Sequence, residues 1–126
     1  MKLSTLMAIK GVIVLVFGIG FVLVPVTVLS WYNVELGAGG AYMTRLFGAA
    51  FILLGLVLWP ARKDTGSVAL KALVMAVFIG DIIGFVVALI GQLSGLVNAL
   101  GWLTVALYFF LAIGFGYHAL KKPKTA

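Results

Sequence analysis

Four long apolar stretches, separated by short links, constrain this chain more than any other feature. They run roughly over residues 7–29, 41–59, 68–91 and 99–120. The hydrocarbon core of a bilayer is about 30 Å thick and takes about 20 helical residues at 1.5 Å each, so each stretch can cross it. The four stretches use most of the 126 residues and leave no room for a separate soluble domain. We therefore predict an all-α fold, an integral membrane four-helix bundle in which residues 1–126 form one domain.

Composition points to the same class. The chain is 64% hydrophobic and only 10% charged, with a mean hydropathy of +1.27, whereas soluble domains are about 25% charged. A soluble helical bundle would carry polar faces on its helices. Residues 11–29 instead contain no charged side chain and a single polar one, Thr27. The first apolar run is also longer than the core of a signal peptide, so we expect it to remain as a span.

The basic residues predict the orientation of the spans. The links at residues 30–40 and 92–98 contain no Lys or Arg. Eight of the nine basic residues instead lie near the other span ends: Lys2, Lys10, Arg62, Lys63, Lys71, Lys121, Lys122 and Lys124. Because cytoplasmic segments retain Lys and Arg, we predict a multi-pass protein of the cell membrane with both termini in the cytoplasm. The net charge of +6 then reflects orientation and attraction to anionic headgroups, and we expect no nucleic-acid partner.

Small residues predict how the helices pack. In the third span they recur at every fourth position, and in the second span two glycines share one face. These residues are Ala72, Ala76, Gly80, Gly84 and Ala88, together with Gly48 and Gly55. Such stripes let helix backbones approach closely in lipid. We expect an interface within a compact bundle, and an interface between two copies of the chain is the alternative.

Proline predicts a local deviation in the first span. Pro25 has no backbone N–H to donate to the carbonyl of Phe21, and its ring crowds that turn of the helix. We therefore expect a bend about one turn before the span ends.

Two charged residues, Arg45 and Asp81, are expected within the spans, where a charge usually finds a partner or marks function. Asp81 should lie near the middle of the membrane and Arg45 about one turn below the outer surface. Helical side chains lean toward the N-terminus of their own helix, which works against contact between these two on antiparallel helices. Asp81 and Arg45 are the candidate ligand-binding or ion-coupling residues. A protonated Asp81, an ordinary ion pair, and an interfacial role for Arg45 remain open alternatives.

Other reactive groups are sparse. The chain has no cysteine, which excludes disulfides and thiolate metal sites. Its one histidine, His118, is expected at the inner interface, and haem ligation by two histidines within one chain is impossible. We expect no catalytic constellation, no metal site and no cofactor.

The segment from Arg45 to Gly55, RLFGAAFILLG, resembles a short arginine–glycine–glycine pattern of the small four-span membrane proteins related to DoxX. In those proteins the pattern usually falls in the first span, whereas here it falls in the second. This places the chain nearer to uncharacterised relatives of the DoxX-like family. The resemblance implies a four-span fold and, for some members, an association with quinone-linked oxidoreductase systems.

Abundant packing signals beside few reactive groups predict a non-enzymatic membrane protein. We expect a binding or assembly subunit in the lipid bilayer, holding a lipid or other amphiphile near Asp81, either as a homo-oligomer or in a larger membrane complex. One alternative is a transporter or channel subunit that acts as an oligomer, with Asp81 as a proton or cation site. Another is a quinone-linked oxidoreductase partner that uses Tyr108, Tyr117 or His118 as hydrogen-bond donors to a quinone ligand.

Overall fold

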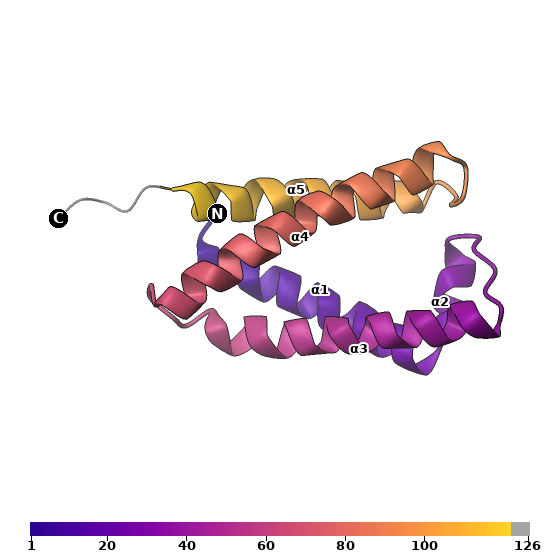
Figure 1. Cartoon of the computed structure of the whole chain (residues 1–126), viewed down its shortest axis with the longest axis horizontal. Helices are drawn as coiled ribbons and strands as arrows, with labels where there is room; N and C mark the ends of the chain where they lie inside the picture. The colour runs from indigo at the N-terminus through magenta and orange to yellow at the C-terminus, as the bar shows by residue number, and fades with distance from the viewer. Residues whose placement is uncertain (122–126) are drawn as a thin grey trace.

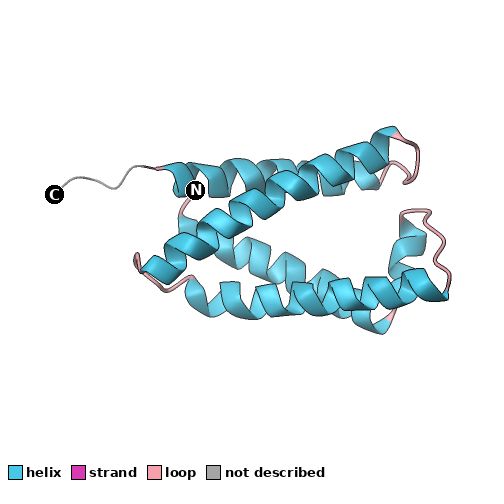
Figure 2. Ribbon diagram, viewed as in Figure 1, coloured by secondary structure: helices cyan, strands magenta, loops and turns pink. Residues whose placement is uncertain are grey.

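The computed structural model describes residues 1–121 and confirms an all-α membrane fold (Figures 1 and 2). Within this part of the chain four helices are long and apolar enough to cross a bilayer, and no strand is present. The long helices are α1 (Leu3–Leu23), α3 (Ala38–Ala61), α4 (Val68–Leu93) and α5 (Gly101–Leu120), and a short helix, α2, spans Pro25–Trp31. Lys122 and Lys124, included in the orientation argument, lie outside the described residues.

The first span is broken rather than bent. Helix α1 ends at Leu23, Val24 leaves the helical conformation with φ −138° and ψ 60°, and α2 restarts at Pro25. Proline suits the first turn of a helix, where its missing N–H costs nothing. As a result, α2 turns away from the axis of α1 and lies across one end of the molecule (Figure 1).

The long helices form two antiparallel hairpins, α1 with α3 and α4 with α5. The hairpins converge at the end that carries the N-terminus, the α3–α4 link and the end of α5, which we call the terminal end (Figure 1). They diverge toward the opposite end, the distal end, which carries α2 and the α4–α5 link. The bundle is therefore a wedge, and less compact than expected.

Glycines bring α1 and α3 together. A Cβ atom added at Gly48 would lie 2.8 Å from the carbonyl oxygen of Gly18, and one added at Gly18 would lie 2.9 Å from that of Gly48. Two turns further along α3, a Cβ atom added at Gly55 would contact the side chain of Leu15 and the carbonyl oxygen of Gly11. Only residues without a side chain permit this backbone approach.

The small residues of α4 are placed differently from those of α3. Ala72, Ala76 and Gly80 are exposed, and no atom of residues 1–121 lies within 4 Å of a Cβ added at Gly80. These three positions of the stripe face away from the other described helices, so they form no interface within residues 1–121. Gly84 instead accommodates the ring of Tyr108, and Ala88 lines the space between the hairpins.

The apolar core lies at the terminal end and draws on all four long helices. Its buried members are Leu6, Met7, Leu58, Leu70, Val74, Val77, Leu111 and Phe115. This cluster holds the hairpins together where they converge.

Hydrogen bonds join the hairpins again at the distal end. The backbone N–H of Asn98, in the α4–α5 link, donates to the carbonyl of Tyr32 over 3.2 Å. The side-chain amide of Asn98 donates to the carbonyl of Trp31 over 3.0 Å. We call these contacts the Asn98 clasp. The wedge is thus tied at both ends, and the space between the hairpins lies in the middle.

Candidate functional site

An ion pair between Lys10 and Asp81 connects the two hairpins. The Lys10 Nζ atom lies 2.5 Å from Oδ1 of Asp81. Both residues are buried, with 6% and 1% of their surfaces exposed. A buried charge is costly unless it is paired, so this contact lets both groups lie inside the membrane-spanning part of the chain.

Lys10 was not expected there. The sequence interpretation placed it where the first span opens, among the orienting cations. The structure begins α1 at Leu3, which puts Lys10 seven residues, or about 10 Å, inside the helix. A sequence signal for the pair does exist. Asp81 requires a partner within the membrane, and Lys10 is the one cation within the predicted first span, residues 7–29.

Arg45, the other predicted site residue, lies apart from Asp81. Its side chain is exposed on α3, and it forms no ion pair with any residue among 1–121. The structure therefore brings Asp81 together with Lys10, and leaves Arg45 on the surface of the α1–α3 hairpin.

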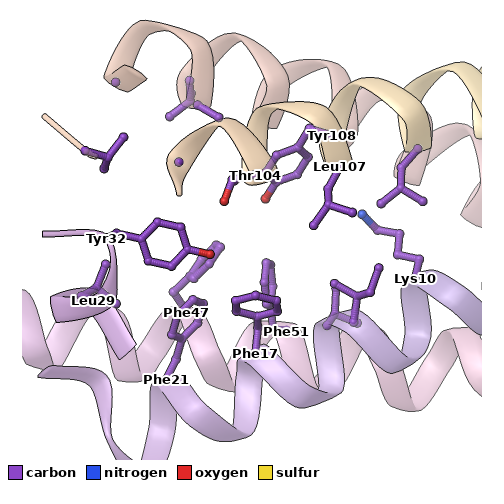
Figure 3. Close-up of a pocket in the computed structure, with 18 of the residues that line it drawn as sticks. Lys10, Phe17, Phe21, Leu29, Tyr32, Phe47, Phe51, Thr104, Leu107 and Tyr108 are labelled. Atoms are coloured by element: carbon purple, nitrogen blue, oxygen red, sulfur yellow. The ribbon is translucent and has the colours of Figure 1, made fainter. Parts of the chain in front are cut away.

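Lys10 also lies at one end of a cavity of about 300 Å³ between the hairpins. One wall is aromatic: Phe17 and Phe21 from α1, and Phe47 and Phe51 from α3 (Figure 3). The Phe47 and Phe51 ring centroids are 4.3 Å apart, and those of Phe21 and Phe47 are 5.7 Å apart. The rings form one continuous apolar surface.

The facing wall carries polar groups. Figure 3 shows the hydroxyls of Thr104 and Tyr108 on α5, and that of Tyr32 at the distal end, directed toward the cavity. The ring of Tyr108 packs against Gly84, and the Lys10 Nζ atom lies 5.7 Å from its centroid. Among the described residues these three hydroxyls form no hydrogen bond. They are therefore free to bind a molecule in the cavity.

Asp81 approaches the cavity only through Lys10. Its Oδ1 atom accepts a hydrogen bond from the Lys10 ammonium, whereas Oδ2 has no hydrogen-bond partner among the described residues. The predicted binding residue is thus the counterion of a cavity residue and does not line the cavity itself.

The remaining candidate donors lie elsewhere. His118 is at the terminal end, where its Nε2 atom is 2.9 Å from the carbonyl oxygen of Met1, and Tyr117 is exposed beside it. Of the three donors considered for a quinone, only Tyr108 lines the cavity. No cluster of metal-ligating side chains occurs within residues 1–121.

Sequence reasoning missed most of the cavity, although a signal for it exists. Phe17 with Phe21, Phe47 with Phe51, and Thr104 with Tyr108 are each four residues apart. Each pair therefore lies on one face of its helix. Three such pairs on three spans mark the faces that meet around the cavity.

Comparison with known proteins adds no further identification. No family model, curated protein or solved structure matches the chain. The resemblance of residues 45–55 to DoxX-like proteins stays a prediction. What the structure shows is a chain with four helices long and apolar enough to cross a membrane, and a cavity between its two hairpins.

Proposed function

We propose that this chain is a non-enzymatic membrane protein that holds a lipid or other amphiphile in the cavity between its hairpins. The observation that carries the proposal is the cavity itself, with a continuous aromatic wall and a few polar groups opposite. Ligand sites combine these features: a mostly apolar lining of about 300–1,000 Å³ and a small number of placed polar groups.

The location of the cavity supports a ligand dissolved in the membrane. It lies among helices that cross the bilayer, so the molecules nearest to it are lipids. The described basic residues other than Lys10 and Arg45 lie at, or within one turn of, the helix ends that form the terminal end: Lys2, Arg62, Lys63, Lys71 and Lys121. Under the positive-inside rule this end is cytoplasmic in the cell membrane, and the cavity then lies toward the outer leaflet.

Filling the cavity tests the proposal. Phe51→Trp places a larger ring on the aromatic wall, whereas Phe110→Trp makes the same change on an exposed face of α5 that does not line the cavity. We expect native mass spectrometry from mild detergent to show a retained amphiphile on the wild type and on Phe110→Trp, and much less on Phe51→Trp. The mass also identifies a quinone if one is bound. Equal occupancy in all three proteins, or none in any, would contradict the proposal.

A second candidate function, proton or cation translocation by an oligomer, is favoured by the buried Lys10–Asp81 pair. Oδ2 of Asp81 is buried and has no hydrogen-bond partner among residues 1–121, and ionisable residues within membrane spans often mark ion pathways or proton relays. The test is flux into liposomes. Translocation requires a flux that Asp81→Asn abolishes, and its absence in an oligomeric preparation excludes this function.

A further inference from the structure

The charges around the cavity already cancel. Among residues 1–121, Lys10 is the one charged residue in the cavity lining, and Asp81 neutralises it directly. Arg45 and Glu35, which lie nearer to the distal end than Lys10 does, do not line the cavity. A ligand with a charged headgroup would therefore bring an uncompensated charge into an apolar space, which is strongly unfavourable.

The free donors suit an uncharged oxygen atom. Thr104 and Tyr108 lie one turn apart on α5 with their hydroxyls directed into the cavity (Figure 3). Each hydroxyl can donate a hydrogen bond to a ligand oxygen, which favours a ligand that supplies such an acceptor. Across from them the phenylalanine wall offers only apolar surface. The two walls thus fit a molecule that is apolar along one side and carries an oxygen acceptor on the other.

Access to the cavity is from the side. The core cluster closes the terminal end, and the Asn98 clasp spans the distal end. Three lining residues are nevertheless exposed: Phe47 on α3 at 48%, Val87 on α4 at 64% and Leu96 in the α4–α5 link at 66%. Phe47 and Val87 belong to helices long and apolar enough to cross a bilayer, so their exposed faces bring the cavity lining to the hydrocarbon of the membrane. A ligand arriving this way is already dissolved in the membrane.

We propose that the ligand is an uncharged amphiphile with an oxygen acceptor, such as a long-chain alcohol, ketone or ester. It enters from the hydrocarbon of the bilayer past the exposed lining residues, and its oxygen accepts hydrogen bonds from Thr104 and Tyr108. This inference rests on the proposed amphiphile-binding function and names the chemical class that the site selects.

Competition between probes of equal chain length tests the class. Full-length protein in liposomes is labelled with a diazirine derivative of hexadecanol, and the labelled peptides are identified by mass spectrometry. Unlabelled hexadecanol, hexadecanesulfonate and hexadecyltrimethylammonium then compete, and the two ions keep their charges at every pH. We expect labelling on the cavity segments of α1, α3 and α5, with hexadecanol competing at least tenfold better than either ion.

Two variants test the proposed hydrogen bonds. Tyr108→Phe removes one cavity hydroxyl and keeps the ring against Gly84, whereas Tyr117→Phe removes an exposed hydroxyl at the terminal end. Loss of one hydrogen bond of about 1 kcal/mol weakens binding about fivefold. We expect this loss for hexadecanol in Tyr108→Phe only, with competition by hexadecane unchanged in both variants.

The outcomes separate the two proposals. If an ion competes as well as the alcohol, or if Tyr108→Phe leaves hexadecanol binding unchanged, the uncharged-oxygen inference is wrong while amphiphile binding stands. If no probe labels the cavity segments, amphiphile binding itself fails.

Discussion

Lys10 and Asp81 show what one pair of residues contributes within a membrane. Each is buried, and each would be an isolated charge without the other. A buried pair adds little net stability over apolar residues, but removing one partner leaves the other uncompensated. The pair therefore makes a wrong approach of the two hairpins costly, and in this way it contributes to specificity.

Breaking the pair should destabilise the fold strongly. We expect Lys10→Met to lower the free energy of unfolding by about 3–5 kcal/mol, because Asp81 remains buried without its cation. The combined change Lys10→Met with Asp81→Asn should recover most of this loss. Arg45→Met, at an exposed position, is the control and should change little. Reversible unfolding in mixed micelles measures all four proteins, and equal stabilities for Lys10→Met and Arg45→Met would refute the argument.

A second residue-scale prediction concerns the α3–α4 link. Asp64 accepts hydrogen bonds from the Ser67 hydroxyl and from the backbone N–H groups of Ser67 and Gly66. These bonds favour the carboxylate and lower the pKa of Asp64 from 3.8 to about 2. Because the folded pKa is the lower one, the stabilisation is complete above pH 3.8 and is lost as the pH falls toward 2.

NMR titration of the Asp64 carboxyl should therefore give a midpoint near pH 2. Ser67→Ala removes the largest of these interactions and should return the midpoint toward 3.8. An unchanged midpoint in Ser67→Ala would show that the hydroxyl does not set this pKa.

The sequence predicts only part of the buried ion pair. Asp81 stands out because a carboxylate is rare in an apolar run. Lys10 does not, because a lysine near the start of a span is normally an orienting residue. Only the helix boundary at Leu3 shows that Lys10 lies inside α1. That boundary depends on where the first turn forms, which the apolar pattern leaves uncertain by several residues.

At the scale of single elements, glycine has opposite roles on α3 and α4. Gly48 lies against the backbone of α1, whereas Gly80 faces away from every described helix. Both positions belong to regular small-residue stripes in the sequence. Spacing identifies such a stripe, but the neighbouring helix decides whether it forms an interface.

The matched substitutions Gly48→Ala and Gly80→Ala should therefore differ. The added methyl group at Gly48 would lie 2.8 Å from both the Gly18 carbonyl oxygen and the Cβ atom of Phe21, so the helices must separate. We expect a loss of about 1–3 kcal/mol. Gly80→Ala meets no atom and should be neutral or slightly stabilising, since alanine favours helix. Thermal unfolding in detergent compares the two, and an equal loss at Gly80 would indicate a partner for that face.

Element boundaries followed the sequence closely except in the first span, where the helix begins earlier and is divided at proline. The predicted spans 41–59, 68–91 and 99–120 lie within a few residues of α3, α4 and α5. The span 7–29 became two helices, since Pro25 begins a new helix rather than bending the old one. Proline predicts that a helix is disturbed, but the angle that follows depends on what the next segment packs against.

At the scale of the whole molecule, the arrangement of helices was the least predictable feature. All four apolar stretches look similar in composition, so nothing in their sequence separates a compact bundle from two diverging hairpins. The arrangement depends on the glycine contacts of α1 with α3 and on the fit of Tyr108 against Gly84. These contacts are long-range, and the cavity results from them.

The Asn98 clasp gives a prediction at this scale. Asn98→Ala removes the side-chain bond to the Trp31 carbonyl and the bond that its Oδ1 accepts from the N–H of Leu100. In this variant we expect the backbone N–H of residue 98 to exchange with deuterium about tenfold faster, because the α4–α5 link separates more often from the end of α2. Ser94→Ala is the control, since its hydroxyl bonds only within its own region of the chain. Identical exchange in both variants would show that Asn98 does not hold the distal end together.

The ion pair also has a consequence for biosynthesis. Lys10 and Asp81 are 71 residues apart, so at about 5–20 residues per second the ribosome makes the cation roughly 4–14 s before its anion. During that interval α1 carries a solitary lysine, close enough to its own start for the flexible stem to reach the headgroups. Completion of α4 then draws the ammonium inward, so the newly made first helix should settle at its final depth only when the third span is inserted.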